Sequence, residues 1–545
     1  MSQEVDRAER RCRRRETLAV SAFLAALAAV LTWPQITVFA TRSVEHQDVY
    51  FNLWRLRWIS HALATSPLEL FGGNIFYPEV RALTFSDAIL VEGLFAAPFF
   101  WLGFPPMLVH NLTLWAALIG SGAGMFVLCR ELTGSRAGAL VASIVFTFAP
   151  YRFDHYMHME LQWALWIPWA FWALHRTIAT ASIRYGLLTG LFIALQMLSS
   201  IYYGIFLATL LPPAGLVLIA TSRRQRIRRV VGALVPGALL AAVICGAYAQ
   251  PYLATNKELG GRSDQEILRF SARPSSYLIA TPDNVMWGQR FTGRSRSERR
   301  LFPGAVALLL ALTGLLLRPP TSTPVVYLLS AILAFEISLG FSGYSFRFLY
   351  NYLPVYQGLR AIARAGLFVL FFVAVLTSFG YAAVAWSLPQ RLRRWLPIAF
   401  VLLVAAEYRV RPLPLVAYPN EPPALYAWLA TQPRGVVAEL PIPEGMPGND
   451  PRYSYLSTFH WFPLLNGYSG FHPPSYVDRI EALRSFPDDA SIARLRRDGA
   501  RYVVVHFDQY RRELRSLVRE MLVTRYRMPE VAAFPEEGSA VFAME

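Results

Sequence analysis

TLAVSAFLAALAAVLTWPQITVFA, residues 17–40, is almost entirely apolar and is long enough to cross a bilayer, which takes roughly 20 apolar residues. An arginine cluster within residues 10–15 precedes it, so the positive-inside rule places the basic segment 1–16 in the cytoplasm. Glu45-His46-Gln47-Asp48 follows, where the chain leaves the lipid on the far side. Ionisable groups close to lipid are costly to desolvate, so a functional role competes with an ordinary solvated loop.

The composition is that of a polytopic membrane protein. The chain has 545 residues, 54% of them hydrophobic, and a mean hydropathy of +0.34. A net charge of +16 would suggest nucleic acid binding in a soluble protein. Here the arginines form short runs between apolar segments, at 223–229 and 391–394. The positive-inside rule explains such runs, so no nucleic acid partner is expected and the lipid bilayer is.

Eleven further apolar segments follow the first one. One of them, 86–104, contains Asp87 and Glu92 and is interrupted by prolines, so we expect it to lie along the interface or dip into it. The other segments then place the Arg-rich loops inside and give about eleven transmembrane helices with a cytoplasmic N-terminus. The spanning segments are 107–129, 137–150, 160–174, 186–200, 203–220, 230–250, 301–317, 324–341, 365–388 and 396–411.

This order of apolar segments and Arg-rich loops predicts a transmembrane domain over residues 17–411 of an inner (plasma) membrane protein. Its outer loops are 41–106, 151–159, 251–300 and 342–364. Residues 412–545 differ in character, because 436–440 and 502–506 have the pattern of short buried strands. Residues 476–483, 489–497 and 509–522 have helical spacing. The predicted fold class is therefore a multi-pass α-helical membrane protein with a small extracytoplasmic α/β domain at the C-terminus.

Polar residues gather in the first outer loop. Asp48 and Asn52 lie one helical turn apart, in a segment that also contains arginines and tryptophans. This pattern suits an amphipathic helix at the membrane interface. Most of the aromatic residues fit an ordinary interfacial belt. The candidate supporting residues of this loop are Glu45, His46, Asn52, Asn74, Tyr77 and Asp87.

The second outer loop contains Arg152, Asp154, His155 and His158. Two histidines three residues apart share one face of a helix. Together with the nearby carboxylates they could bind a metal, hold a phosphate or transfer a proton, and a buried structural histidine is the simpler alternative. Tyr202 and Tyr203, at the next outer turn, could line a sugar or lipid pocket, although helix packing explains them equally well.

Arginines recur in the two later outer loops. Their guanidinium groups offer a bidentate fork for phosphate, and the positive-inside rule does not explain arginines on the outer face. Contact with solvent or lipid headgroups is the alternative for each one separately. The candidates for binding an anionic group are Arg262, Arg269, Arg360 and Arg364.

The ordered set of these features resembles the GT-C superfamily of integral-membrane glycosyltransferases. The segments that carry the resemblance are Asp48-Val49-Tyr50-Phe51-Asn52-Leu53-Trp54, Asn74-Ile75-Phe76-Tyr77-Pro78, His155-Tyr156-Met157-His158 and Leu353-Pro354-Val355-Tyr356-Gln357-Gly358-Leu359-Arg360. The resemblance implies inverting transfer of a sugar from a polyprenyl-phosphate-linked donor to an extracytoplasmic glycan, lipid or protein acceptor.

The resemblance also implies roles for particular residues. Asp48 would be the general base, and Arg360 or Arg364, with His155 or His158, would stabilise the departing lipid phosphate. Some members have outer-loop Asp-x-Asp or Glu-x-Asp pairs, whereas this chain has Glu45-x-x-Asp48. A divalent cation, Mg²⁺ or Mn²⁺, therefore stays an open question, with no certain cofactor and no assigned metal ligand.

Three alternatives compete with this interpretation. A transporter or flippase of a lipid-linked or anionic substrate would bury charges within its spans, whereas most charges here lie at segment ends and in loops. A transferase similar to the O-antigen ligases would use Arg and His and would not need Asp48. A non-catalytic assembly subunit could keep the fold alone.

Overall fold

The computed structural model describes residues 2–221, 226–290, 296–317, 321–442 and 448–544. The chain divides into two compact units. We call residues 1–38, 112–249 and 260–414 the helical unit, and residues 39–111, 250–259 and 415–545 the mixed unit. Each unit is described separately.

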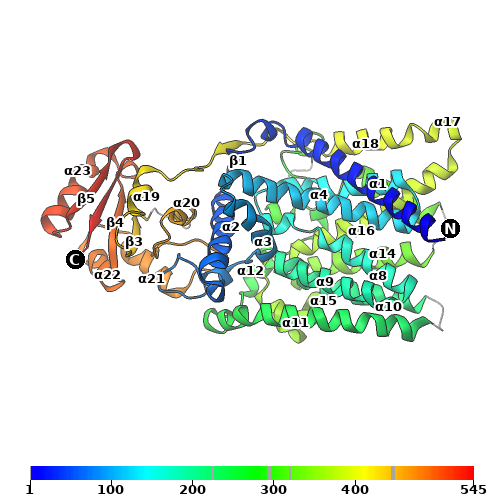
Figure 1. Cartoon of the computed structure of the whole chain (residues 1–545), viewed down its shortest axis with the longest axis horizontal. Coiled ribbons are helices and arrows are strands. Elements are labelled where there is room, and N and C mark those ends of the chain that lie inside the picture. The colour runs from blue at the N-terminus through cyan, green and yellow to red at the C-terminus, as the bar shows by residue number, and fades with distance from the viewer. Residues whose placement is uncertain (1, 222–225, 291–295, 318–320, 443–447, 545) are drawn as a thin grey trace. The chain divides into compact units, whose positions relative to one another are not determined.

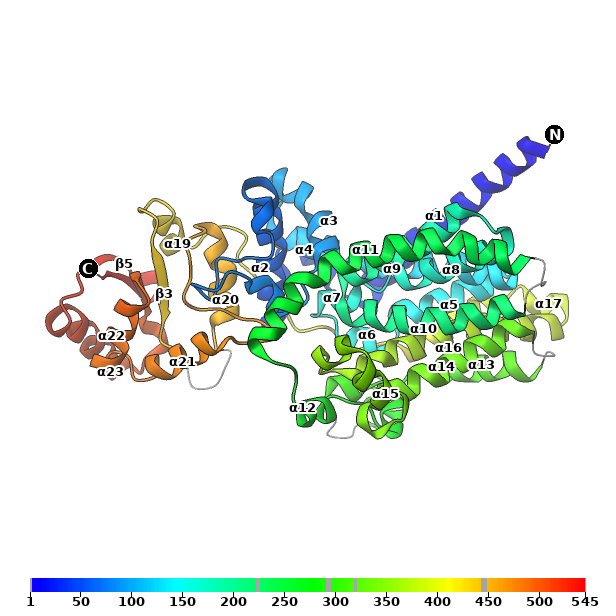
Figure 2. The same ribbon diagram turned by 90° about the horizontal axis from the view of Figure 1, so that it is seen from below.

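The helical unit is built from long apolar helices that run side by side (Figures 1 and 2). Its first half contains α1 (Ser2–Leu31), α4 (Pro106–Thr133), α5 (Arg136–Phe148), α6 (Pro150–Asp154), α7 (Met159–Gln162), α8 (Trp166–Thr180), α9 (Ile183–Ser199) and α10 (Ile201–Ala220). Its second half contains α11 (Ile227–Leu259), α12 (Asp264–Arg269), α13 (Ala305–Leu316), α14 (Ser322–Ser338), α15 (Ser345–Tyr352), α16 (Gly366–Ser387), α17 (Gln390–Arg393) and α18 (Leu396–Glu407).

Small residues allow these helices to approach one another closely. Helix α16 packs against α5, α13 and α14 and is buried along most of its length. A Cβ atom on Gly380 would lie 1.7 Å from the carbonyl oxygen of Leu310, so only glycine permits the contact between α13 and α16. Between α9 and α11, a Cβ atom on Gly190 would lie 1.8 Å from the carbonyl oxygen of Gly237. Backbone contacts of this kind are typical of helices packed within a membrane.

In the described part of the chain, four helices are long and apolar enough to cross a membrane. These are Pro106–Thr133, Ile201–Ala220, Ile227–Leu259 and Ile362–Ser387. Five shorter apolar helices accompany them: Leu90–Trp101, Ile183–Ser199, Ala305–Leu316, Ser322–Ser338 and Leu396–Glu407. A helix overlaps every apolar segment predicted from the sequence, and the total of about eleven spans stays a prediction.

The first apolar segment differs from the expectation of one helix through residues 17–40. Helix α1 ends at Leu31, and the chain continues into a short 3-10 helix at Gln35–Val38. Pro34 explains this end, because proline has no N–H for the helix ladder and disfavours helical geometry at the preceding residue, Trp33.

The mixed unit combines two helices from the first outer loop with the C-terminal region. Its elements are β1 (Arg42–Val44), α2 (Gln47–Thr65), α3 (Leu90–Trp101), β2 (Leu415–Ala417), α19 (Ala424–Leu429), β3 (Val436–Leu440), α20 (Asp450–Leu456), α21 (Pro474–Leu483), α22 (Asp489–Arg497), β4 (Ala500–His506), α23 (Arg512–Glu520), β5 (Glu530–Phe534) and β6 (Ser539–Ala543). Helix α3 spans about 18 Å at 1.5 Å per residue, well short of the bilayer core.

A four-stranded sheet forms the core of the C-terminal region, in the order β3-β4-β6-β5 (Figure 1). Strands β3 and β4 are parallel, and the other neighbours are antiparallel. Leu483, Ile492 and Val518, from α21, α22 and α23, pack with Val503 and Val505 of β4 in one buried cluster. The strands predicted at 436–440 and 502–506 are present, with β4 beginning two residues earlier than expected.

The extent of this unit differs from the predicted domain 412–545, because residues 39–111 belong to the same compact unit. Strands β1 and β2 pair antiparallel, with Arg42 opposite Ala417 and Val44 opposite Leu415. Helix α2 packs on α20 as well as on α3. The pairing of β1 with β2 and the contact of α2 with α20 join segments more than 350 residues apart, so no local sequence pattern reports them.

Candidate active site

Asp48 lies in the first turn of α2, in the mixed unit. The side chain of His46 caps this helix by accepting a hydrogen bond from the backbone N–H of Asp48 at 3.1 Å. A carboxylate in this position is also stabilised by the helix dipole. The hydroxyl of Tyr468 donates a 2.7 Å hydrogen bond to Oδ1 of Asp48, and Nδ1 of His46 lies 3.6 Å from Oδ2. The hydrogen bond from Tyr468 thus holds the carboxylate, whose side chain is 15% exposed, while His46 holds the backbone of the same residue.

Two other predicted residues of the first outer loop hold the chain in place. Asn52 accepts a hydrogen bond from Arg55, whose guanidinium also donates to the backbone oxygen of Asp87 at 2.7 Å. Asn74 accepts from Nε1 of Trp54 at 2.9 Å and donates to Oγ of Ser457 at 2.9 Å. Asn52 and Asn74 are buried, and these contacts position the loop around α2.

Of the remaining predicted residues in this loop, Asp87 is buried, whereas Glu45 and Tyr77 are exposed. The structure therefore brings together Asp48 and His46 and joins them with Tyr468.

The helical unit contains a buried ion-pair cluster around Glu298. Arg364 donates a 3.1 Å hydrogen bond to Oε1 of Glu298, and Nε2 of His155 lies 3.3 Å from Oε2. The ring of His158 lies 5.4 Å from that of His155. Both members of the Glu298–Arg364 pair have side chains only 9% exposed, and His155 is fully buried.

Burial and charge set the protonation of this cluster. Burial lowers the pKa of His155 to about 3, against the attraction of Glu298, so the imidazole is neutral at pH 7. Burial alone would raise the pKa of Glu298, but the charge of Arg364 and its hydrogen bond outweigh burial and lower the pKa to about 2. Glu298 is therefore ionised.

Arg262 and Arg360 meet at a second carboxylate of the same unit. Their Nη1 atoms lie 3.5 Å and 3.4 Å from Oε1 of Glu266. Tyr202 connects this group to Arg364, because its hydroxyl accepts from the backbone N–H of Arg360 at 3.0 Å and its ring lies 4.7 Å from the guanidinium of Arg364.

We call Arg262, Arg360, Arg364, Glu266, Glu298 and Tyr202 the arginine cluster. It contains three guanidinium groups and two carboxylates, so it carries a net positive charge. Burial lowers the pKa of Arg262 to about 10, which still leaves it protonated at pH 7.

Four other predicted residues have different surroundings. Arg152 is buried and donates to the backbone oxygen of Gln162 at 2.9 Å, so its guanidinium fixes the turn before α8. Asp154 forms a 2.9 Å ion pair with Arg300 and accepts from Thr281 at 2.9 Å, while burial raises its pKa. Tyr203 is fully buried. Arg269 is exposed, with its guanidinium 5.9 Å from the ring of Phe270.

The sequence does not decide whether Mg²⁺ or Mn²⁺ binds near Asp48. Across the ranges that the structure describes, no three His, Cys, Asp or Glu side chains are grouped so that they could hold a metal ion. Near Asp48 the donors are that carboxylate and His46, with Glu45 exposed. This donor set does not fit Mg²⁺ or Mn²⁺, which prefer several oxygen ligands.

Three residues of these sites, Glu266, Glu298 and Tyr468, are not among the candidates that the sequence offered. Glu298 stands before Arg299 and Arg300, so it was assigned to a charged loop and not to an arginine-binding carboxylate. Tyr468 lies 420 residues from Asp48, so no local pattern in the sequence connects the two.

No protein-family model and no curated protein matches the sequence of this chain. Among solved structures, it is similar to the arabinofuranosyltransferase AftD from Mycobacteria, with a TM-score of 0.65 and 14% identity over 97% of this chain and 40% of that chain. A mutant form of AftD gives a TM-score of 0.58 and 15% identity, over 90% of this chain and 36% of that chain. The archaeal oligosaccharyltransferase AglB from Archaeoglobus fulgidus gives a TM-score of 0.49 and 11% identity, over 90% and 69% of the two chains.

The fold is therefore GT-C-like, as the sequence predicted. The chain spans about 40% of the length of AftD. Together with the long apolar helices, this fold makes the protein a mostly helical membrane protein.

Proposed function

We propose that this protein is an inverting membrane glycosyltransferase that moves a sugar from a polyprenyl-phosphate donor to an acceptor outside the cytoplasm. The observation that carries the proposal is the Asp48 carboxylate, held by Tyr468 at the start of α2, which His46 caps. The fold of the chain is GT-C-like along almost its whole length. The acceptor is a cell-envelope glycan, lipid or protein.

Asp48 acts as the general base. Its carboxylate accepts the proton of the acceptor hydroxyl while that oxygen attacks the anomeric carbon of the donor sugar. The bond between the anomeric carbon and the phosphate oxygen breaks on the opposite face, so the configuration inverts. Tyr468 donates to Oδ1, which fixes the orientation of the carboxylate before the acceptor arrives.

The arginine cluster binds the lipid phosphate. The leaving polyprenyl phosphate gains negative charge as its bond to the sugar breaks, and preorganised guanidinium groups stabilise that charge. Arg262 and Arg360 are the residues assigned to this contact, because they share a single carboxylate, Glu266. Arg364 supports them by holding Glu298 and stacking on Tyr202.

Neutral His155 and nearby His158 supplement the cluster on the Glu298 side. The topology that accompanies this proposal has a cytoplasmic N-terminus and an extracytoplasmic C-terminal α/β region.

Two alternatives make different predictions. A flippase would move the lipid-linked sugar without breaking it, and it would place charge pairs within the spans. Here the pair of Asp154 and Arg300 lies outside the helices that are long enough to span, and Arg364, the partner of Glu298, lies at the very start of one of them, Ile362–Ser387. Charges at the end of a span favour an enzyme at the membrane surface. A transferase similar to the O-antigen ligases would depend on the arginine cluster alone and would tolerate replacement of Asp48.

The experiment uses the full chain in proteoliposomes that contain undecaprenyl-phosphate-linked arabinofuranose, mannose or glucose, with arabinohexaose, mannohexaose or maltohexaose supplied as the acceptor. A transferase releases undecaprenyl phosphate and forms a glycoside in equal amounts with one of these donors. Movement of an intact donor between leaflets, with no release of undecaprenyl phosphate, would replace the proposal by a flippase.

A further inference from the structure

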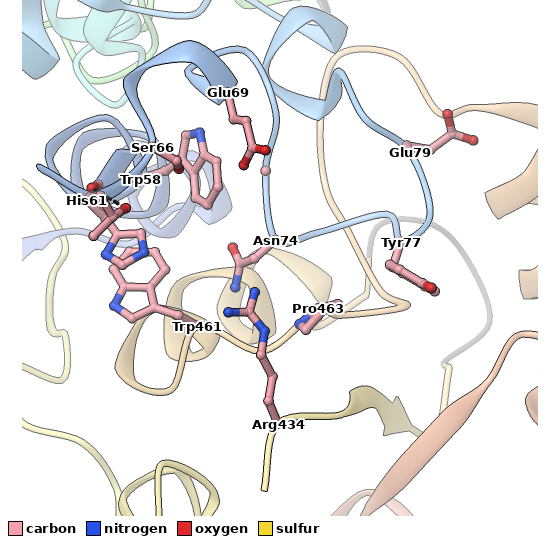
Figure 3. A pocket seen from close by; sticks show the side chains of 12 residues that line it. Trp58, His61, Ser66, Glu69, Asn74, Tyr77, Glu79, Arg434, Trp461 and Pro463 are labelled. Carbon is pink, nitrogen blue, oxygen red and sulfur yellow. Dashed lines mark hydrogen bonds between the residues drawn. The ribbon is translucent and has the colours of Figure 1, made fainter. Parts of the chain in front are cut away.

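A pocket of about 470 Å³ lies within the mixed unit (Figure 3). The C-terminal half of α2 forms one side of it, and the segments before β3 and after α20 form the other. Its volume falls in the range of small-molecule sites, which is roughly 300–1,000 Å³. The lining residues used below are Trp58, His61, Glu69, Asn74, Arg434 and Trp461.

Aromatic rings form one wall of this pocket. The imidazole of His61 stacks on the indole of Trp461 with centroids 4.0 Å apart and planes 10° apart, as Figure 3 shows. The ring centroids of Trp58 and Trp461 lie 6.2 Å apart. Nε1 of Trp58 donates to the backbone oxygen of Leu70 at 3.0 Å, which fixes the ring of Trp58. Two tryptophans and an imidazole thus offer rigid apolar surface with polar edges.

Trp461 adopts a backbone conformation that its side chain disfavours. Its φ of 58° lies in the left-handed region, where a bulky residue costs on the order of 1–3 kcal/mol. The backbone N–H of Trp461 donates to the backbone oxygen of Ser457 at 2.8 Å, so the turn after α20 holds the residue in place. Strain of this kind is often found at binding sites.

Charged groups approach the pocket from opposite sides. Figure 3 shows the carboxylate of Glu69 and the guanidinium of Arg434 both pointing toward the space around Asn74. Glu69 and Arg434 are exposed to solvent, whereas Asn74 is already bonded to Trp54 and Ser457. Glu79 also lines the pocket, and its carboxylate accepts a hydrogen bond from Ser475, so the lining holds two carboxylates and one guanidinium. The net negative charge disfavours a phosphate, and the mixture of donors and acceptors suits hydroxyl groups that both donate and accept.

We propose that this pocket binds neutral saccharide units of an acceptor glycan chain. A sugar ring presents an apolar C–H face, which packs on the tryptophans, and a rim of hydroxyls, which reach Glu69 and Arg434. The pocket itself is a glycan site independent of catalysis, and its role for the acceptor rests on the proposed function.

The position of the pocket on α2 defines which part of the acceptor it holds. Asp48 lies in the first turn of this helix, and Trp58 follows ten residues later, about 15 Å further along the axis at 1.5 Å per residue. A single sugar cannot occupy both places. The pocket therefore holds units distant from the reacting hydroxyl, which makes the acceptor an oligosaccharide or polysaccharide.

The test measures binding of neutral hexasaccharides to the full chain in nanodiscs by isothermal titration calorimetry. The probes are arabinohexaose, mannohexaose and maltohexaose, and we expect at least one to bind. Trp461→Ala should weaken that binding at least tenfold, Trp461→Phe should restore part of it, and Arg434→Ala should weaken it by several fold. Arg497→Ala, an exposed arginine of α22 outside the pocket, should bind as the wild type does.

The outcomes separate this inference from the proposed function. Asp48→Asn should keep hexasaccharide binding, because Asp48 does not line the pocket. If the wild type binds none of the three probes, or if Trp461→Ala and Arg434→Ala both bind as the wild type does, the inference is overturned whether or not transfer occurs. Loss of binding in Trp461→Ala together with no donor cleavage by the wild type would sustain the glycan site and overturn the transferase. Arg434 is exposed, so its variant tests the pocket even if a Trp461 variant fails to fold.

Discussion

Replacement of Asp48 by asparagine removes the proposed base and leaves the surrounding contacts nearly intact. The amide has the same shape as the carboxylate, and its oxygen can still accept the hydrogen bond from Tyr468. General bases contribute about 10²- to 10⁴-fold to a rate. At about 1.36 kcal/mol per factor of ten, the variant should raise the activation free energy by about 2.7–5.4 kcal/mol.

The cost in folding stability should be much smaller. A carboxylate in the first turn of a helix contributes about 0.3–1 kcal/mol through the helix dipole. A hydrogen bond to a neutral acceptor is weaker than one to a charged acceptor by about 1 kcal/mol. The free energy of unfolding should therefore fall by no more than about 2 kcal/mol, and the midpoint of thermal unfolding in detergent by a few degrees.

The assay compares kcat and donor KM for the wild type, Asp48→Asn and the control Asp478→Asn in the same proteoliposomes. Asp478 is an exposed residue of α21, so its variant should transfer sugar at the wild-type rate. The expected result for Asp48→Asn is a fall in kcat of at least a hundredfold with a donor KM changed by less than threefold. Transfer by Asp48→Asn within a factor of three of the wild type would refute the assignment and favour a mechanism similar to that of the O-antigen ligases.

Three further predictions concern the charged groups. Glu298→Gln leaves Arg364 buried without its counter-charge and should lower the free energy of unfolding by about 3–5 kcal/mol. The double variant Glu298→Gln/Arg364→Met should recover part of this loss. Equal melting temperatures of the wild type and the single variant would contradict the buried pair. Arg262→Ala or Arg360→Ala should raise the donor KM about 10- to 100-fold, since hydrogen bonds to charged groups contribute about 1.5–3 kcal/mol. The control Arg347→Ala, at an exposed arginine, should leave the donor KM unchanged. An unchanged donor KM in both the Arg262 and the Arg360 variant would remove these two residues from the donor site. Burial raises the pKa of Asp450 from 3.8 to about 8, so the folded protein holds a proton that the unfolded chain releases, and stability should fall between about pH 4 and pH 8 and then level off. Asp450→Asn should flatten this part of the profile in thermal unfolding from pH 5 to pH 8, and an unchanged slope would argue against a protonated Asp450.

Local patterns in the sequence predicted the secondary structure well, because they record which residues must be buried. The short apolar run at 436–440 predicted β3, and the helical spacing at 489–497 predicted α22. The apolar run alone predicted a helix through residue 40, whereas α1 ends at Leu31, before Pro34.

Long-range contacts were not predictable in the same way. The pairing of β1 with β2 and the hydrogen bond from Tyr468 to Asp48 depend on the fold of the whole mixed unit. Arg152 illustrates a second limit of local patterns. Its position close to two histidines suggested a phosphate ligand, whereas its guanidinium donates to the backbone oxygens of Leu161 and Gln162. A side chain type thus indicates what chemistry is available, and only the surrounding contacts decide whether it is already used.

The stereochemistry of the product tests the central claim most directly. The full chain is given an undecaprenyl-phosphate-linked sugar of known anomeric configuration, and the linkage formed on the acceptor is determined by proton NMR. Attack assisted by Asp48 as a base predicts the opposite configuration at the anomeric carbon, with one undecaprenyl phosphate released per glycoside formed. Retention of configuration, or consumption of donor without formation of a glycoside, would contradict direct displacement assisted by Asp48.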